Sequence, residues 1–590
     1  MNTTSKMLLN QPENCVTEAI DGYLLSRSDL VRLQGYKVVI RSELPRGKVA
    51  LLSGGGAGHE PAHIGLVGKG MLSAAVSGDV FASPPTEAIS QTLRVLCESE
   101  CTGCLLIVKN YTGDKLAFSA AAEVSRNSGF PCEMVLVADD VAVDGGPVTG
   151  CRGLAGVVFV HKIAGALSDL GEQLDIVVEA ARIISSSVST VGASISTCNV
   201  PGVITSNRLI GEKTEVGLGI HGEPGVLLIE KTLTAIELAD HLVQAIRNRI
   251  ANGAHIAVLI NGLGGLSGVE TGVISLAIVT RIHKEGFVID RLFIAPLVTS
   301  FDAKGVSLSV LPVNISLGPR SRLTLIEALD AATSVPHWPL ASKGVDDLGV
   351  KVNLRIPTIL RFDSELDESS IKLYVDSDIV CHAFEAIERS MFESAATLDA
   401  LDALAGDGDT GDTMKRVSIA ALIGVKEASK HSQRISVTLL FEEASKSIGR
   451  AAGGTSGILY SLMLNIAAHT LRNNSNSNGN VIDRVLNAAE TALEAVQRVG
   501  GAMLGDRTFL DALVPALRSA RLANEQCLNV KEIVLAAAEG AASGAESTSL
   551  MIPKVGRATY VNSDIVIGNK DAGAVAASIW LRALANSLPV

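Results

Sequence analysis

Two histidines in this chain of 590 residues stand among glycines, in loops that follow predicted strands. His221 lies in GLGIHGEPG at 217–225, and His59 lies in GGGAGHEP at 54–61. Because glycine has no side chain, the backbone of such a loop can approach a ligand closely. In open α/β sheets, ligands bind at the edge where the strands end. Both histidines are therefore candidates for chemistry on a bound small molecule.

A third strand end carries a lysine and a carboxylate. The segment KNYTGD at 109–114 follows the apolar run 104–108, so Lys109 and Asp114 are expected near the same sheet edge. A neutral imidazole can add to a ketone carbon, and a carboxylate can take a proton from a hydroxyl group. The alternative is structural, with Asp114 forming a turn and Lys109 ending a strand in solvent.

Three aspartates lie close together in LDALAGDGD at 401–409. Asp407 and Asp409 lie on a turn, and Asp402 precedes them by about one and a half helical turns. Mg²⁺ takes oxygen ligands, commonly a few carboxylates together with nucleotide phosphates. The long calcium loop of an EF-hand, with its final glutamate, is missing. The alternative is a solvated acidic turn, but three aspartates together favour a metal site.

Glycine clusters open several predicted helices in the second half of the chain. GGTSG at 453–457 offers backbone N–H groups and hydroxyls of the kind that bind phosphate at helix starts. It is not a P-loop, because no lysine follows in the required pattern. The segment 500–509 and Gly556-Arg557 are similar, and Arg557 could neutralise phosphate charge. Taken alone, each cluster also fits a simple helix end, and Arg557 fits a surface residue.

Cys97, Cys101 and Cys104 have the spacing of a radical-type iron–sulfur motif. The simpler interpretation is that Cys97 ends a helix and Cys104 starts a buried strand, where small cysteines are common. We favour this structural interpretation. The 9 cysteines of the chain do not indicate a disulfide framework.

Composition limits the possible functions. The net charge is -12 and no basic block occurs, so the chain lacks the electrostatic footprint of nucleic-acid binding. No apolar run approaches the roughly 18 residues needed to cross a bilayer. The apolar run near the N-terminus is too short for a signal peptide. We therefore expect a cytoplasmic protein with neither a membrane nor a nucleic-acid partner.

Hydrophobic patterns predict an α/β domain in the first half. Apolar runs at 49–52, 105–108 and 134–138 are typical of buried parallel strands, with helical patterns between them. Strands and helices continue to residue 333, and a break near 185–195 suggests two α/β subdomains.

The second half has a different pattern. Eight helical patterns follow one another from residue 376 without a convincing strand. The predicted domains are 7–333 and 376–588. They are joined by a linker at 334–375, which contains prolines and glycines and has no clear period.

With these motifs in this order, the chain resembles the single-chain, ATP-dependent dihydroxyacetone kinases. The similarity runs over almost the whole chain and rests on the segments 54–61, 78–85, 109–114, 153–156, 217–225, 402–409 and 453–457. It implies a substrate-binding α/β domain followed by an ATP-binding all-α domain, a barrel of eight antiparallel helices. The implied reaction is phosphorylation of dihydroxyacetone, and also of glyceraldehyde, by ATP with Mg²⁺. The implied assembly is a homodimer, and a domain-crossed form of it is one option.

The resemblance also assigns roles to residues. The family's covalent histidine falls on His221, which would form a hemiaminal with the substrate carbonyl and so reject glycerol. His59 and Asp114 fall on the acid/base positions. The implied substrate contacts are Gly56, Ala57, Gly58, His59, Lys109, Asp114 and His221. The implied magnesium ligands are Asp402, Asp407 and Asp409. The implied nucleotide contacts are Thr410, Gly411, Thr413, Thr455, Ser456, Gly500, Thr508, Phe509, Arg557, Asp571, Ala572 and Gly573.

Two departures from the family pattern concern these sites. Ala57 stands where the family has serine, which leaves open a preference for a four-carbon ketose such as erythrulose. Ala572 replaces a proline and frees a backbone torsion near the nucleotide. Two other functions stay open: a lyase that splits FAD into AMP and cyclic FMN, and a non-catalytic sugar-sensing module. Loss of His221 or of the aspartates would mark a sensing module, and all are present.

Overall fold

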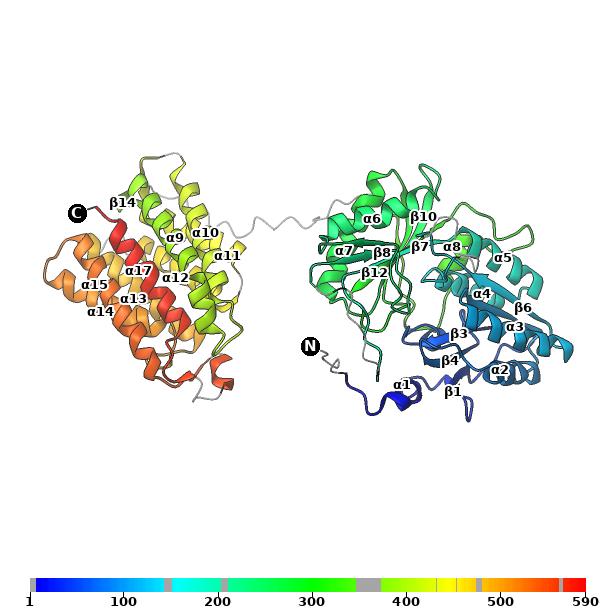
Figure 1. Cartoon of the computed structure of the whole chain (residues 1–590). Coiled ribbons are helices and arrows are strands. Elements are labelled where there is room, and N and C mark those ends of the chain that lie inside the picture. Colours follow the sequence, from blue (N-terminus) through cyan, green and yellow to red (C-terminus); the bar gives the residue numbers. More distant parts are fainter. Residues whose placement is uncertain are drawn as a thin grey trace. The chain divides into compact units, whose positions relative to one another are not determined.

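The computed structural model describes residues 7–142, 151–202, 209, 211–345, 373–430, 432–452, 454–473, 480–555, 557–561 and 566–589. The chain divides into two compact units (Figure 1). An α/β unit lies within residues 1–355, and a helical unit lies within residues 356–590.

The first sheet of the α/β unit has the strand order β1-β2-β4-β3-β5-β6. Its strands are β1 (Leu30–Arg32), β2 (Val38–Arg41), β3 (Val49–Ala57), β4 (Ala74–Val80), β5 (Gly103–Lys109) and β6 (Cys132–Val137). The last four run parallel, and β1 and β2 form an antiparallel edge. Leu51 and Leu52 of β3 belong to cores on opposite faces of this sheet. Burial on both faces explains why the sequence here is a continuous apolar run.

The second sheet has the strand order β13-β11-β10-β12-β7-β8-β9. Its strands are β7 (Ser189–Ser194), β8 (Thr214–Val216), β9 (Leu227–Ile229), β10 (His255–Gly262), β11 (Val288–Ile294), β12 (Gly305–Pro312) and β13 (Ser342–Lys343). β10 and β11 are parallel, and the other pairs are antiparallel. Because this sheet begins at Ser189, the predicted division into two α/β subdomains near 185–195 is confirmed.

Helices cover the sheets in layers. α2 (Thr86–Glu98) and α3 (Thr112–Asn127) pack on one face of the first sheet, and α6 (Ala235–Arg247) and α7 (Gly268–Lys284) on one face of the second. α4 (Val157–Leu170) and α5 (Leu174–Ser187) lie in a core that both sheets share. Phe159 of α4 contacts Phe293 of β11 within this core. The shared core therefore fixes one sheet against the other.

The peripheral elements of the α/β unit include α1 (Cys15–Leu24) and α8 (Leu325–Asp330). The first part of the predicted linker also packs here. Val335 is buried, Trp338 contacts Phe293, and β13 pairs with β11. Residues 346–372 of the predicted linker lie outside the described residues.

All eight predicted helices of the second unit are present. They are α9 (Ser377–Asp402), α10 (Thr410–Ser429), α11 (Val437–Ala451), α12 (Gly454–Asn473), α13 (Val481–Gly500), α14 (Leu510–Glu525), α15 (Val530–Ser547) and α17 (Ala572–Ser587). Each packs against the next of these along the chain, and α17 also packs against α9, so the contacts close into a ring. The expectation of no strands is wrong in one detail. β14 (Tyr374–Asp376) and β15 (Arg434–Ser436) form a short antiparallel pair, because the segment before α9 meets the segment before α11.

Among the residues described, no helix is long and apolar enough to cross a membrane.

A buried lysine links α4 to α8 and gives a test of this packing. The Nζ of Lys162 donates to the carbonyl oxygen of Ala328 (2.7 Å), and burial lowers the pKa of Lys162 to about 8. In the unfolded chain this pKa is about 10.4. Between these values the unfolded chain binds the proton and the folded chain does not, so folding becomes more favourable as pH rises. The free energy of unfolding of the wild type, relative to Lys162→Met, should therefore rise from about pH 8 to pH 10.

The measurement is denaturant unfolding at several pH values in a Trp580→Phe background, where Trp338 of the α/β unit is the remaining tryptophan. Lys69→Met, at an exposed lysine of the same unit, is the matched control and should give a pH-independent difference. If the difference in free energy of unfolding between the wild type and Lys162→Met were also independent of pH, the lowered pKa of Lys162 would be contradicted.

Candidate active site

His59 is held in place by the second sheet. It follows β3, and its Nδ1 lies 2.8 Å from the carbonyl oxygen of Thr299, which follows β11. The backbone N–H of Thr299 donates back to the carbonyl oxygen of His59 at 3.2 Å. Nδ1 therefore carries the hydrogen, and Nε2 is an acceptor that finds no partner among the described residues. Burial lowers the pKa of His59 well below its usual value, so this ring is neutral.

The ring of His221 is enclosed by aromatic neighbours. The ring centroids of Tyr111, His59 and Phe81 lie 4.4, 4.8 and 5.4 Å from it. The side chain keeps 21% of its surface exposed, so a small molecule can reach it. Burial, with a smaller contribution from nearby cations, lowers the pKa of His221 to about 3. At neutral pH the imidazole is unprotonated and has the lone pair that a nucleophile needs.

A glutamate and an arginine anchor the His221 loop. Glu223 accepts the backbone N–H of His221 at 2.8 Å, and its carboxylate lies 4.0 Å from His221 Nδ1. Arg152 lies 3.8 Å from Glu223, and it donates to the Asp140 carboxylate and to the Gly217 carbonyl oxygen, both at 2.7 Å. The loop is thus fixed at both ends of its glycine-rich segment.

Lys109 and Asp114 face one small space at the end of β5. A Cβ on Gly55 would stand 2.9 Å from Lys109 Nζ and 3.2 Å from Asp114 Oδ2, so only glycine leaves this space open. Lys109 is 0% exposed and Asp114 is 2% exposed, which excludes the solvated alternative for the lysine. Burial raises the pKa of Asp114, and the Lys109 ammonium opposes the shift.

The end of β3 and the first residues after it have small side chains or none, so neighbouring groups approach their backbone closely. A Cβ on Gly56 would stand 2.8 Å from the Phe81 backbone, and one on Gly58 would stand 2.7 Å from the Phe81 ring. Ala57 is 3% exposed and packs with the apolar residues of the shared core. A serine here would bring a hydroxyl group into apolar surroundings, so packing accounts for the alanine.

The three clustered cysteines form no metal-binding group among the described residues. Cys97 is exposed, whereas Cys101 and Cys104 are buried. Burial raises the pKa of Cys101 to about 11 and that of Cys104 well above its usual value. The structural interpretation of this cluster agrees with the fold.

In the helical unit, the three aspartates converge as a cation would require. Asp402 ends α9, Asp407 and Asp409 lie in the turn before α10, and one carboxylate oxygen from each lies within 4.8 Å of the others. The backbone N–H of Asp409 also donates to Asp402 (3.0 Å). A Cβ on Gly406 would stand 2.5 Å from the Asp402 carboxylate, so the glycine lets the turn close around it. Three hard oxygen ligands at this spacing fit Mg²⁺.

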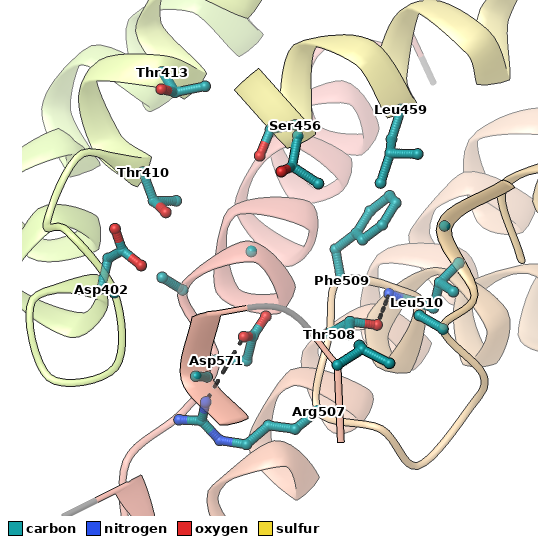
Figure 2. A pocket seen from close by; sticks show the side chains of 18 of the residues that line it. Asp402, Thr410, Thr413, Ser456, Leu459, Arg507, Thr508, Phe509, Leu510 and Asp571 are labelled. Atoms are coloured by element: carbon teal, nitrogen blue, oxygen red, sulfur yellow. Dashed lines mark hydrogen bonds and ion pairs between the residues drawn. The ribbon is translucent and has the colours of Figure 1, made fainter. Parts of the chain in front are cut away.

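A cavity of about 500 Å³ opens beside these aspartates (Figure 2). The helix starts of α10, α12 and α17 contribute to its wall, and Leu459 and Phe509 provide an apolar side. Helix N-termini present unpaired N–H groups that bind anions, so the wall suits a phosphate chain. The predicted residues that line it are Asp402, Asp407, Asp409, Thr410, Thr413, Thr455, Ser456, Gly500, Thr508, Phe509, Asp571, Ala572 and Gly573.

Two predicted nucleotide contacts are not among the lining residues. Gly411 packs instead against α9, where a Cβ would stand 2.0 Å from the carbonyl oxygen of Ala395. The side chain of Arg557 lies outside what the structure describes. Sequence reasoning missed Arg507, although it directly precedes the predicted Thr508. Figure 2 shows Arg507 beside Asp571, 3.9 Å away, and burial raises the pKa of Asp571 to about 6.

Comparison with known proteins decides the family. The Dak1 domain matches residues 21–337, more than half of the chain, and the DAK2 domain matches residues 404–586. The dihydroxyacetone kinase of Citrobacter freundii is 34% identical over 99% of this chain and 99% of its own. The chain belongs to the dihydroxyacetone kinase family.

Other members of the family have different names. A putative 3,4-dihydroxy-2-butanone kinase from Solanum lycopersicum is 38% identical over 99% of this chain and 98% of its own. A triokinase/FMN cyclase from Bos taurus is 36% identical over 98% of each chain. The crystal structure of the C. freundii dihydroxyacetone kinase with AMP-PNP and Mg²⁺ has a TM-score of 0.63 and is 32% identical, covering 99% of this chain and 100% of that chain. The family resemblance and the α/β-plus-helical fold class are thereby confirmed.

The aspartate cluster predicts divalent-cation binding. Asp402→Asn, Asp407→Asn and Asp409→Asn should each weaken Mn²⁺ binding at least about tenfold, because each removes a charged ligand. Isothermal titration calorimetry on the full chain measures this affinity. Asp412→Asn is the matched control, because Asp412 lies in the first turn of α10, is paired with Lys415 and is outside the cluster. Equal affinity in all four variants would exclude a metal site here.

Proposed function

We propose that this protein transfers the γ-phosphoryl group of ATP to a hydroxyl group of dihydroxyacetone, and also of glyceraldehyde. The observation that carries the proposal is the neutral, partly exposed His221 at the sheet edge, in a unit that also holds the Lys109–Asp114 space. Family membership, with a C. freundii relative named dihydroxyacetone kinase, supports the reaction class.

His221 selects substrates that have a carbonyl group. Its unprotonated ring nitrogen adds to the carbonyl carbon, the C=O π electrons move to oxygen, and that oxygen takes a proton. The hydrogen on the other ring nitrogen leaves, so the hemiaminal is neutral. Glycerol has no carbonyl group and cannot be held in this way. A pKa of about 3 keeps His221 reactive throughout the neutral pH range.

Asp114 and His59 handle the proton of the hydroxyl group that is phosphorylated. Burial makes the Asp114 carboxylate a stronger base than a solvated one, and the Lys109 ammonium keeps it ionised. His59 offers Nε2 as a second acceptor. Lys109 also has hydrogens with which to orient the substrate oxygen.

The helical unit supplies the nucleotide site in this proposal. Asp402, Asp407 and Asp409 would hold the magnesium of ATP, which neutralises triphosphate charge when it is bound. The hydroxyl groups and N–H groups at the starts of α10 and α12 would hold the phosphates, and the apolar side of the cavity would take the base. A relative of known structure binds AMP-PNP and Mg²⁺, which supports ATP as the donor.

Two other activities deserve a direct comparison. The S. lycopersicum relative is named for a four-carbon substrate, which favours a four-carbon ketose such as erythrulose as the alternative. The B. taurus relative is named triokinase/FMN cyclase, which favours FAD cleavage to cyclic FMN as a second activity.

The test is ATP-dependent phosphorylation of dihydroxyacetone, glyceraldehyde, erythrulose and glycerol by the wild type and His221→Ala. We expect dihydroxyacetone to be turned over best, glycerol not at all, and kcat/KM for the ketoses to fall at least about a hundredfold in the variant. His255→Ala, at an exposed histidine of β10, is the control and should keep full activity.

Other outcomes have definite meanings. An advantage of erythrulose of about tenfold, or about 1.4 kcal/mol, would reassign the substrate. Full ketose phosphorylation by His221→Ala would remove the covalent role of the histidine. No phosphorylation, with cyclic FMN formed from FAD and Mn²⁺, would replace the kinase by the lyase.

We also propose a homodimer in which the α/β unit of one chain is served by the helical unit of its partner. His221→Ala and Asp407→Asn each disable one of the two sites. If the sites combine across chains, unfolding and refolding the two variants together should restore about a quarter of wild-type activity, by random pairing. Each variant refolded alone is the control. Activity no higher in the mixture than in the controls would refute the crossed arrangement.

A further inference from the structure

A third histidine, His63, lies next to Lys109 of the candidate site. His63 stands just before the short 3₁₀ helix Ile64–Leu66 and is 4% exposed. Its Nε2 lies 2.6 Å from Lys109 Nζ, within hydrogen-bond distance of this fully buried ammonium. None of the roles proposed above involves His63.

The hydrogen bonds below His63 fix which of its nitrogens carries the hydrogen. Ser53 Oγ donates its single hydrogen to the carbonyl oxygen of Ile107 at 2.6 Å. Ser53 Oγ can then only accept from His63 Nδ1 (3.3 Å) and from His161 Nε2 (3.2 Å). His63 is therefore hydrogenated on Nδ1, and its Nε2 is the acceptor for Lys109. This chain of donors also explains the buried His161, which packs in α4 as a hydrogen-bonded core residue.

A neutral acceptor suits this position better than a charged one. The charges that act on Lys109 are the carboxylates of Asp114, from α3, and Asp139, after β6. The imidazoles near it, from three further segments, are His59, His63, His161 and His221. A carboxylate at residue 63 would compete with Asp114 for the ammonium charge. A neutral imidazole satisfies one N–H of Lys109 and leaves its charge directed at Asp114 and the space beside Gly55.

We propose that His63, held by Ser53 as its Nδ1–H tautomer, is a positioning residue that keeps Lys109 protonated and aimed at the substrate space, so that Asp114 stays ionised. The proposal rests on the proposed function in one respect, the role of Asp114 as the acceptor of the substrate's hydroxyl proton. The tautomer of His63 and its bond to Lys109 do not depend on that role.

The expected effect on pH dependence has a definite sign. Without an acceptor, the buried ammonium is less stable, so the pKa of Lys109 falls further. A less charged Lys109 lets the pKa of Asp114 rise. Activity that needs ionised Asp114 is then lost at a higher pH on the acidic side. Activity that needs charged Lys109 is lost at a lower pH on the basic side.

The first experiment compares pH profiles of kcat/KM for dihydroxyacetone in full-length wild type, His63→Leu and His63→Gln. His63→Leu should narrow the profile, with the acidic limb moved up by about one pH unit or more. His63→Gln should restore most of the width of the kcat/KM pH profile. Its amide oxygen can accept from Lys109, and its amide nitrogen can donate to Ser53. His161→Phe is the matched control, since it removes a bond to Ser53 and none to Lys109, and should leave both limbs in place. The proposal would be overturned if both limbs of the kcat/KM profile lay at the same pH in His63→Leu as in the wild type. It would also be overturned if the limbs lay at the same pH in His63→Leu and His63→Gln.

A second experiment does not need activity. Two-bond ¹⁵N–¹H correlation spectra of the ¹⁵N-histidine-labelled full chain report the tautomer of each ring, and the signal lost in His63→Gln identifies His63. We expect the Nδ1–H form. The Nε2–H form, or a protonated ring at neutral pH, would overturn the proposal even in an active kinase. The Nδ1–H form in a protein that phosphorylates no ketose would instead refute the proposed function and leave the hydrogen-bond chain intact.

Discussion

The α/β unit depends on the packing of one apolar helix, α4, between two sheets. Residues 157–168 of this helix are buried without exception, and Phe159 makes the contact with Phe293 of the second sheet. The strand ends of both sheets then meet at one place, where His59 from the first sheet reaches Thr299 from the second. The bond between these two residues sets the tautomer of a candidate catalytic group. The chemistry of the site therefore depends on a hydrophobic contact at some distance from it.

Burial is the main cause of the pKa shifts at this site. It is the largest cause of the lowered pKa values of His59, His63, His161 and His221, and of the raised pKa of Asp114. Desolvation penalises whichever form is charged, so it keeps the imidazoles neutral and would also neutralise the carboxylate. A buried cation resolves this conflict, because Lys109 favours the ionised carboxylate and disfavours imidazolium at the same time. The same argument gives the buried ammonium of Lys109 a role in a place without solvent.

Local patterns were sufficient to predict much of this protein. The eight helices of the second unit have strong periodicity, and the aspartates and helix-start hydroxyls lie within short segments, so their clustering follows from local geometry. The strand ends that carry His59 and Lys109 could be identified from the apolar runs before them. His221 instead follows the short strand β8, which ends at Val216, before the end at residue 220 expected from the sequence. The short edge strands β9 and β13 were not predicted, because three residues or fewer give no measurable alternation. β12, eight residues long and inside the second sheet, was not predicted either.

Contacts between distant segments could not be predicted in this way. Thr299 is 240 residues from His59, and no local signal connects them. The acceptor role of His63 depends on the hydrogen bond that Ser53 donates to the carbonyl oxygen of Ile107. The sequence does not show that these two residues are in contact. Arg507 lies beside a predicted residue, but its approach to Asp571 needs the fold of the whole helical unit. The packing of residues 334–345 on the α/β unit could not be predicted either, because this stretch of sequence has no periodicity.

The bond between His59 and Thr299 has a consequence for biosynthesis. A ribosome that has released only the first sheet has already made His59 and Asp114, but not the carbonyl oxygen that orients the His59 ring. The second sheet, with His221 and Thr299, emerges later and must dock on α4 before the ring is oriented. A growing or truncated chain therefore carries these reactive groups without their arrangement. The His59 ring is therefore oriented only after the segment that follows β11 is in place.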